Sequence, residues 1–543
     1  MRKKLSPTLW AVIAGALAVA LTGSALGASG KLGSADAAGV LRESIGSEPP
    51  SLDPGLATDT TSANIVFNIF DPLVKLGPAP ELKAVPNAAS SWTQKGTTVT
   101  LNLNKAVRWT NGQPVTAQDY VWSWLRTISP ELAADYSYQF FGIKGATEYN
   151  SCDPAKANCN ALRAQVGVKA LGKYRLQITL TSPQPWFIQQ LSHHSFTAVH
   201  RATVEKFGAK WTEPGNIVTS GAFRLTSWKH DASLTLVKNT KWRNASSVKL
   251  NTVQLLLIND ATTALNAFKA GNLDVDSSGL NPADIKALKK TPWLKVYKAL
   301  ATYYYGINVK NITDVNQRRA MAFAIDRKAI TKYITQLGQQ PARGFTPIGI
   351  AGGPTILQKS FFPSTRQLAK AKAYMAKVKS PKRDIKIYIN NVAGHINIAT
   401  AVQAYWKELG LNVEIKVMEW KQYLQFLGPP PNSDVDVYRL GWVYDYPDAQ
   451  NGLVLWTCDS GNNNTNWCNK KFDSLIDQAN ATADTAKRYQ LYQQAEALIS
   501  GPSGQVPLMP IYWYVYSNLV KPNVKGYDVN PMDQIDYTKM SVS

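Results

Sequence analysis

The chain has 543 residues, of which 45% are hydrophobic and 10% aromatic, and a net charge of +22. This length exceeds one small core and this composition excludes an intrinsically disordered chain, so we expect a folded protein of two or three lobes. The charge predicts a basic, solvated surface and no nucleic-acid partner, because the sequence has no basic block with interleaved aromatic residues.

The N-terminus has the pattern of an export signal. Residues 2–4 are basic, residues 9–21 are apolar and residues 25–27 are small, in the order that signal peptides follow. We therefore expect residues 1–38 to be a signal peptide and flexible leader, and the exported chain to lie in the periplasm or on the outer face of the cytoplasmic membrane or cell wall. An uncleaved N-terminal anchor is the alternative, although the apolar run is short for a membrane span.

Hydrophobic periodicity predicts strands that alternate with helices along the rest of the chain. The predicted strands are 97–103, 174–180, 218–228, 232–237, 253–258, 302–308, 385–390, 411–419 and 506–516. The predicted helices are 116–128, 260–270, 314–329, 395–409, 471–479 and 485–500. A capping box, Thr116 to Asp119, opens the first of these helices. The elements fall into two blocks, before and after about residue 300, which favours two α/β lobes.

The four cysteines form two local pairs, Cys152 with Cys159 and Cys458 with Cys468. In an exported chain this spacing predicts two disulfides that each close a small loop. Each bond would stabilise the fold by about 2–3 kcal/mol through loop-closure entropy. A four-thiolate zinc site is the alternative, but the pairs lack the Cys-x-x-Cys spacing typical of such sites.

Residues 435–447, with the sequence VDVYRLGWVYDYP, form the stretch around which we expect the function to be organised. The residues that share one face under period-2 geometry are Arg439, Gly441, Val443 and Asp445. Arg439 and Asp445 would lie roughly 20 Å apart in an extended chain. A peptide with a free amine and a free carboxylate presents the opposite charges over a similar length. The alternative is an ordinary strand whose end charges are solvated.

Motifs of catalysis and metal binding are missing from the sequence. The five histidines form no His-Glu-x-x-His site, and no Gly-x-Ser-x-Gly, Walker A or dinucleotide fingerprint is present. The sequence therefore predicts no enzyme activity, no cofactor and no metal. An exported, two-lobed α/β chain without such motifs is more often a binding protein.

Seven segments resemble those of a known family. They are GSEPPSLDP at 46–54, VRWTNGQPVTAQDYVWSW at 107–124, EKFGAKWTEPGNIVTSGAFRL at 205–225, ATYYYGIN at 301–308, RRAMAFAIDRKAI at 318–330, RLGWVYDYPDA at 439–449 and LVKPNVKGY at 519–527. Through these segments the chain resembles the oligopeptide- and dipeptide-binding proteins of bacterial ABC importers, extracellular solute-binding protein family 5. The resemblance is strongest to the oligopeptide-binding branch.

The resemblance implies an α/β fold of the periplasmic-binding-protein type. In this fold two α/β lobes form a clamp, and an extra lobe is inserted near the N-terminus. The boundaries that it implies are 39–72, 200–300 and 510–543 for lobe I, 73–199 for the extra lobe II and 301–509 for lobe III.

The resemblance also implies roles for residues of a peptide site. Asp445 would bind the α-ammonium of the peptide. Gly441 and Val443 would be backbone partners on one side of the peptide, and Asp59 and Thr60 would belong to the opposing segment. This use of Gly441 has a physical reason, because a residue without Cβ lets another backbone approach closely.

The remaining implied site residues hold the other end of the peptide or its side chains. Arg439 and His395 resemble the cations that meet the C-terminal carboxylate of short peptides. Tyr138, Trp420 and Trp442 resemble the walls of side-chain pockets.

The chain also departs from the family at four positions. The family member compared has an acid at the position of Thr58 and a lysine near that of Thr335, and both changes bear on peptide length. Its interlobe cysteines correspond to Ala301 and Val443, neither of which is cysteine in this chain.

We therefore expect a monomeric solute-binding protein that captures short peptides and delivers them to the permease of an ABC importer. One alternative is a surface protein that senses peptides or adheres through them without transport. Another is the same fold with a different solute, such as an oligosaccharide or a nickel complex. An enzyme is the third alternative.

Overall fold

The structure is a computed structural model that describes residues 39–352, 362–428, 431–501 and 503–543. The predicted signal peptide and leader lie outside the described residues. Within the described ranges, no helix has the length and apolar character needed to cross a membrane.

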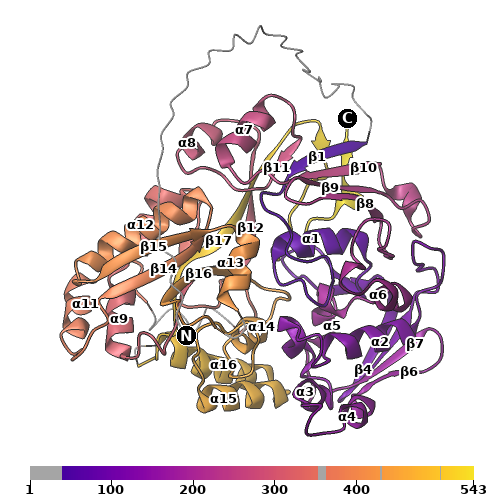
Figure 1. Cartoon of the computed structure of the whole chain (residues 1–543), viewed down its shortest axis with the longest axis horizontal. Helices are drawn as coiled ribbons and strands as arrows, with labels where there is room; N and C mark the ends of the chain where they lie inside the picture. Colours follow the sequence, from indigo (N-terminus) through magenta and orange to yellow (C-terminus); the bar gives the residue numbers. More distant parts are fainter. Residues whose placement is uncertain (1–38, 353–361, 429–430, 502) are drawn as a thin grey trace, which may run out of the picture. The chain divides into compact units, whose positions relative to one another are not determined.

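A mixed sheet of 11 strands organises the fold, in the order β15-β14-β16-β12-β17-β11-β1-β10-β9-β8, with β13 paired to β17. Its strands are β1 (Val40–Ser44), β8 (Phe223–Lys229), β9 (Ser233–Lys238), β10 (Thr252–Leu256), β11 (Val275–Asp276), β12 (Leu294–Ile307), β13 (Gln340–Pro341), β14 (Asp384–Asn390), β15 (Asn412–Met418), β16 (Val437–Val443) and β17 (Leu508–Val520). The two blocks that the sequence predicts as separate lobes thus share one sheet. The long strands β12 and β17 connect them (Figure 1).

Smaller sheets complete the β-structure. A four-stranded antiparallel sheet has the order β4-β5-β7-β6, and two ribbons pair β2 with β3 and β18 with β19. These strands are β2 (Val74–Leu76), β3 (Ala84–Pro86), β4 (Ala89–Lys95), β5 (Thr98–Leu103), β6 (Val168–Ala170), β7 (Arg175–Thr179), β18 (Val524–Lys525) and β19 (Ser541–Val542). The four-stranded sheet falls inside 73–199, the range expected for lobe II. The lobe boundaries themselves stay a prediction.

Helices flank the strands and carry most of the connections. The longer ones are α1 (Thr60–Ile69), α2 (Ala117–Thr127), α4 (Cys159–Gln165), α6 (Arg201–Phe207), α7 (Ala261–Lys269), α9 (Val315–Phe323), α11 (Leu368–Met375), α12 (Ala393–Lys407), α13 (Trp420–Leu427), α14 (Ala449–Val454), α15 (Lys470–Ala481) and α16 (Thr485–Ser500). The predicted capping box of α2 is present between Thr116 and Asp119. The helix predicted over 314–329 is interrupted, because α9 ends at Phe323 and Asp326 caps a separate short helix, α10 (Arg327–Ala329).

Both predicted disulfides are present, Cys152–Cys159 and Cys458–Cys468. Within the described residues, the one cluster with metal-ligand spacing consists of Cys458, Cys468 and Asp473, and its two sulfurs are bonded to each other.

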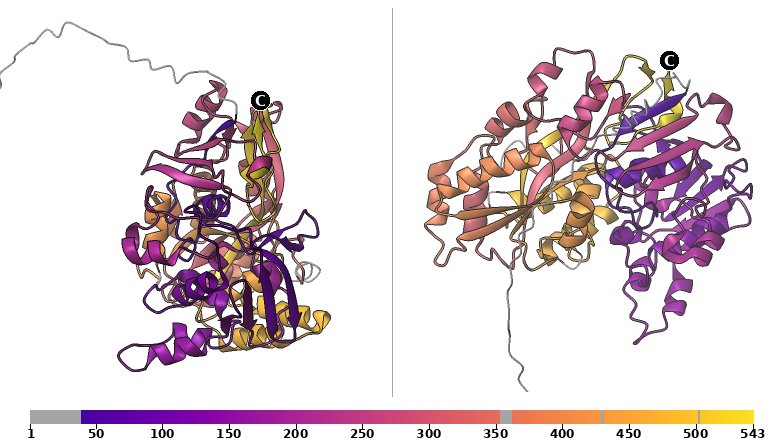
Figure 2. Two further views of the ribbon diagram at one scale, coloured as in Figure 1. Left: turned by 90° about the vertical axis from the view of Figure 1, so that its right-hand side faces the viewer. Right: turned by 45° about the horizontal axis from the view of Figure 1, so that its top comes forward.

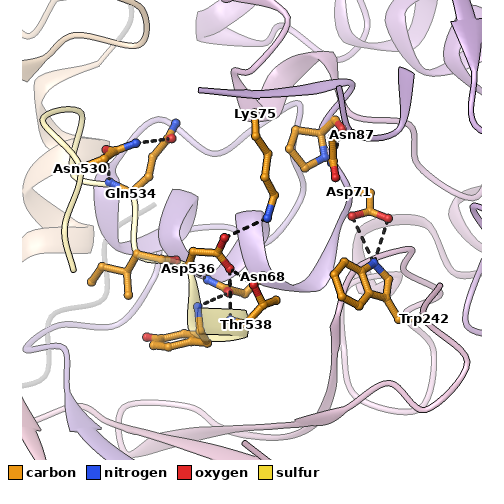
Figure 3. Close-up of polar contacts among 12 residues, drawn as sticks. Asn68, Asp71, Lys75, Asn87, Trp242, Asn530, Gln534, Asp536 and Thr538 are labelled. Carbon is orange, nitrogen blue, oxygen red and sulfur yellow. Dashed lines mark hydrogen bonds and ion pairs between the residues drawn. The ribbon is translucent and has the colours of Figure 1, made fainter. Parts of the chain in front are cut away.

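The C-terminal segment is fixed against the N-terminal part of the sheet. Its end lies beside β1, as Figures 1 and 2 both show. Asn64 and Asn68 of α1 accept hydrogen bonds from the backbone of Ile535 and Tyr537 at 2.9 and 3.0 Å. Lys75 adds an ion pair to Asp536 at 3.0 Å (Figure 3). These contacts hold residues 530–537 at the wall of the cavity described below.

Candidate functional site

A cavity of about 490 Å³ lies between α1, the loop before α12, α13, β16, β17 and the C-terminal segment. Its lining includes the predicted site residues Asp59, Thr60, His395, Trp420, Arg439, Gly441, Trp442, Val443 and Asp445. Tyr138 does not line the cavity. It lies behind Tyr136, with ring centroids 5.7 Å apart, and its hydroxyl accepts a hydrogen bond from Asn462 at 3.3 Å. Tyr136 thus forms the wall that the sequence assigned to Tyr138.

Asp445, just after the end of β16, is held by side chains from three separate segments. Its Oδ2 accepts hydrogen bonds from Gln139 Nε2 and Asn451 Nδ2, both at 2.8 Å. Its Oδ1 lies 3.3 Å from His193 Nε2. Asn451 Oδ1 in turn accepts from the backbone N–H of Asp445 and from Trp442 Nε1. The carboxylate is therefore fixed in position and lines the cavity.

Aromatic rings surround this carboxylate. Tyr136 lies 4.7 Å from the His193 ring and 6.1 Å from Trp442, measured between ring centroids. Burial raises the pKa of Tyr136 well above its usual value, and the charge of Asp445 raises it further. Burial and the neighbouring His193 lower the pKa of His194 well below its usual value. The Asp445 carboxylate therefore lies among aromatic rings.

Arg439 on β16 is a buried cation without a carboxylate partner in the part of the chain that the structure describes. Its guanidinium donates to Asn390 Oδ1 at 3.2 Å and to the Tyr514 hydroxyl, and its Nε has no partner among the described residues. It stacks over Tyr303 at 4.5 Å from the ring centroid. Because a buried charge without a counterion is costly, this arrangement favours an anion as ligand.

His395 lies near Arg439, but its charge differs from the sequence-based expectation. Burial and the positive charge of Arg439 lower the pKa of His395 well below its usual value. Its Nδ1 is buried and has no hydrogen-bond partner among the described residues. The imidazole is thus neutral, because it shares a buried site with a permanent cation, and it is suited to hydrogen bonding rather than to ion pairing.

Gly441 also makes room for a side chain of the protein itself. A Cβ built at Gly441 would lie 2.8 Å from the Tyr514 hydroxyl oxygen and 3.1 Å from the Tyr514 ring. The close approach that Gly441 permits is therefore that of Tyr514, whose hydroxyl accepts a hydrogen bond from Arg439. Gly441 thus makes room for the residue that orients the cation.

The backbone of β16 has one free edge beside the cavity. Residues 437–443 pair with β12, which places Ala301 opposite Val443, whereas β14 pairs only with Val437 and Tyr438. The N–H of Tyr444 donates to β12 and the carbonyl of Arg439 accepts from the Tyr423 hydroxyl, on the opposite edge. Because edges alternate along a strand, the N–H and C=O groups of Gly441 and Val443 point away from β12. These are the backbone groups of β16 with which an extended ligand could form hydrogen bonds.

The opposite wall is formed by the N-terminus of α1. Asp59 caps this helix by accepting from the N–H of Ser62 at 3.2 Å. Its second oxygen accepts from Trp420 Nε1 at 2.9 Å, which links α1 to α13 across 361 residues of sequence. Asp59 is therefore satisfied by protein groups, so its role at the site is to hold Trp420 and the adjacent backbone in place.

Several residues of the site have no local signal in the sequence. Gln139, His193 and Asn451 hold Asp445, and Asn390 and Tyr514 hold Arg439. Tyr514 lies in a predicted strand, and His193 belongs to none of the motifs sought in the sequence. Their contacts cross up to 306 residues of sequence, so no spacing rule finds them.

Comparison with known proteins places the chain in a family. The model of bacterial extracellular solute-binding proteins, family 5 (middle), matches residues 83–464. The oligopeptide-binding protein OppA of Bacillus subtilis is 32% identical over 503 residues, covering 90% of this chain and 89% of the relative.

Two solved structures provide a comparison of shape. Haemophilus influenzae OppA in complex with the peptide RPPGFSPFR has a TM-score of 0.85 at 28% identity, covering 93% of this chain and 99% of that one. The unliganded open form of the periplasmic murein tripeptide-binding protein MppA has a TM-score of 0.63 at 29% identity, covering 93% and 98%. The sequence match and the expected periplasmic-binding-protein-like fold agree, and the chain belongs to family 5 of the bacterial extracellular solute-binding proteins.

Proposed function

We propose that this chain is an extracytoplasmic receptor that captures short peptides in its cavity and delivers them to an ABC-type import permease. The observation that carries the proposal is the free edge of β16, which lies between a fixed carboxylate, Asp445, and a buried cation, Arg439. A peptide in extended conformation has a main chain that fits such an edge and two charged termini that fit such ends.

The main chain would be recognised by β-strand addition. Gly441 and Val443 offer N–H and C=O groups that every peptide can pair with, whatever its sequence. Tyr136, Trp420 and Trp442 border the same space and provide apolar walls for side chains. Recognition of this kind accepts many sequences, because it reads groups that all peptides share.

The termini would fix the register of the peptide. Asp445 would accept the α-ammonium, and Arg439 with neutral His395 would bind the C-terminal carboxylate of short peptides. An ion pair at 4 Å gains roughly 4 kcal/mol at an effective dielectric constant of 20, before desolvation is subtracted. Thr58 and Thr335 replace charged residues of the family member compared, which we expect to change the accepted peptide length.

Closure around the ligand would accompany binding. The TM-score is higher for a relative in complex with a peptide than for an unliganded open form, 0.85 against 0.63. We infer that the described residues have the closed arrangement and that a peptide selects it from an equilibrium with an open one. Contacts such as Asp59 to Trp420 would then form on closing.

The partners and location follow from the proposed role. The receptor would act as a monomer, outside the cytoplasmic membrane, and would contact the permease subunits of the importer. The alternatives are peptide sensing or adhesion without transport and binding of an oligosaccharide. A sugar gains nothing from the opposed charges of Asp445 and Arg439, so these residues favour the peptide.

Ligands retained by the purified protein test this proposal directly. The mature chain would be purified without unfolding, denatured, and its released ligands identified by mass spectrometry. We expect a mixture of short peptides with free amino termini. Calorimetry on protein stripped by denaturation and refolding would then show binding of a free-amine peptide and weak binding of its acetylated form. Recovery of sugars alone, or equal affinity for both forms, would contradict the proposal.

A further inference from the structure

The cavity is unexpectedly acidic for so basic a chain. The carboxyl groups that line it are those of Asp59, Asp135, Glu419, Asp445 and Asp533. Arg439 is the only arginine or lysine among the lining residues that the structure describes. Asp445 and Asp59 are held by several protein donors, and Glu419 caps α13. Asp533 differs from these three, because its carboxyl has few partners.

Asp533 is presented to the cavity by a tight turn. The side chain of Asn530 closes this turn by accepting from the N–H groups of Met532 and Gln534 at 3.0 and 2.9 Å and by donating to Gln534 Oε1 at 2.8 Å (Figure 3). The backbone of Asp533 has φ of +57° and donates to the Asn530 carbonyl. The turn therefore fixes where this carboxyl lies.

Asp533 is ion-paired with no cation among the residues that the structure describes. Its hydrogen-bond partner is the Thr60 hydroxyl. The Tyr516 hydroxyl, close enough to feel the charge of Asp533, is buried and has no hydrogen-bond partner in the described part of the chain. Both residues and Thr60 line the cavity. An acid and a hydroxyl oxygen that face one space can both accept hydrogen bonds from a ligand cation.

We propose that Asp533, Thr60 and Tyr516 form a subsite for a cationic side chain, lysine or arginine, of the bound peptide. This inference rests on the proposed peptide-binding function and deepens it. The ammonium or guanidinium would donate to the Asp533 carboxylate and to the Tyr516 oxygen, and the Thr60 hydroxyl would keep its bond to the carboxylate. The walls of the cavity would thus bind one charged side chain in addition to the two termini.

The protonation of Asp533 agrees with such a role. Burial raises the pKa of Asp533 to about 7, and the charge of Glu43 contributes to the rise. A bound cation would favour the ionised form, so binding of a lysine side chain is coupled to loss of a proton. The other titratable groups near this carboxyl are Glu43, Tyr514, Tyr516 and Tyr527. Burial raises the pKa of each tyrosine, so the tyrosines stay protonated in the pH range of the experiment. Burial raises the pKa of Glu43 to about 6, so Glu43 titrates in the same range as Asp533.

Lysine-scanning calorimetry tests the subsite. Alanine-based peptides of three to five residues would carry a single lysine, or norleucine, its uncharged counterpart of similar length, at each position in turn. We expect one lysine position to bind roughly tenfold more tightly than norleucine at pH 8. In Asp533→Asn this preference should disappear while the all-alanine peptides keep their affinity. Asparagine tolerates the left-handed backbone of this position, so the variant should fold.

A matched control and a pH series complete the experiment. Asp528→Asn removes the same charge from an exposed residue outside the cavity and should keep the lysine preference. In the unmodified protein the ratio of lysine to norleucine affinity should fall between pH 8 and pH 5.5. Glu43 also titrates in this range, so the same pH series on Asp533→Asn isolates its contribution to the lysine preference.

Two results would overturn the subsite: equal affinity for lysine and norleucine at every position, or a lysine preference that survives in Asp533→Asn. Failure of all peptides to bind the unmodified protein would instead contradict the proposed function, and with it the subsite.

Discussion

The two ends of the cavity carry opposite charges, Asp445 and Arg439, and the protein surrounds these two side chains in different ways. Asp445 accepts hydrogen bonds from the side chains of Gln139 and Asn451, with His193 Nε2 at 3.3 Å, and these neighbours orient a carboxylate that lines the cavity. Arg439 is surrounded by tyrosines, and its Nε is unpaired among the described residues. The acidic end is thus satisfied before a ligand arrives, whereas the basic end is short of an anion.

This difference predicts separate roles for the two residues, one in anchoring every peptide and the other in selecting peptides by length. A preorganised carboxylate binds the α-ammonium of every peptide at little cost in reorganisation. A buried cation instead gains from a carboxylate only when the peptide ends at the right distance. We therefore expect Asp445 to contribute to the affinity for all peptides and Arg439 to discriminate between them.

The largest expected effect is that of Asp445→Asn. This variant keeps the shape of the side chain and removes the charge, so peptides with a free amine should bind about 100-fold more weakly. Acetylated peptides should bind the variant and the original protein with similar, low affinity, since the same interaction is already missing. Calorimetry on the original protein and the variant, each with a free-amine and an acetylated peptide, measures the coupling between the carboxylate and the amine. Asp434→Asn, at an exposed carboxylate before β16 that pairs with Lys386 and accepts a hydrogen bond from the Tyr388 hydroxyl, is the matched control and should leave peptide affinity unchanged. If acetylated peptides also lost about 100-fold in affinity, Asp445 would support the fold rather than bind the peptide amine.

The sequence allowed this prediction because Asp445 follows a strand with clear period-2 alternation and lies in a family segment. The capping box of α2 and both disulfides were also predictable, because their partners are within about ten residues of each other in the sequence. The resemblance to the family gave the fold class, which local patterns alone left as two α/β blocks.

Long-range contacts set the limit of that prediction. The blocks share a sheet because β12 and β17 are longer than the strands predicted at 302–308 and 506–516. The neutrality of His395 and the contact between Gly441 and Tyr514 depend on packing between distant segments, which no spacing rule encodes. Tyr138 was assigned to the wall through the resemblance to the family, but its neighbour Tyr136, whose ring centroid is 5.7 Å away, lines the cavity.

The next effect is that of Arg439→Gln, which removes the cation from the other end. We expect short peptides with a free carboxylate to lose roughly 30-fold in affinity, while amidated or longer peptides lose much less. Affinities of a length series with free and amidated C-termini measure the contrast. Arg224→Gln, at an exposed residue of β8, serves as the control. Equal losses at all lengths and in both series would show that Arg439 does not measure peptide length.

A smaller effect is expected when the support of Arg439 is disturbed. In Gly441→Ala the new Cβ would meet Tyr514 and displace its hydroxyl from Arg439. We expect about a tenfold loss in affinity for short free-carboxylate peptides, since Arg439 stays but loses its orientation. In a Tyr514→Phe background the same substitution should cost less, because the closest atom is gone. Gly394→Ala, where the nearest atom is 4.0 Å away, should be neutral. Equal costs in both backgrounds would locate the clash elsewhere.

The smallest effect on the affinity for peptides without lysine is that of Asp533, an acid with fewer side-chain partners than Asp445, whose removal changes the stability of the peptide-free protein instead. Its pKa of about 7 in the folded protein exceeds the usual 3.8, so the folded state binds more protons than the unfolded state between these values. Stability from this group therefore falls as pH rises through the window and is constant above it. Asparagine carries no such charge. In peptide-free protein, Asp533→Asn should match the original chain near pH 4 and exceed its free energy of unfolding by up to about 4 kcal/mol at pH 8, at about 1.4 kcal/mol for each pH unit between the two pKa values. Urea denaturation at a series of pH values measures the difference, and Glu43 cancels because both proteins carry it. A difference in the free energy of unfolding that does not change with pH would mean that Asp533 has the same pKa in the folded and unfolded protein.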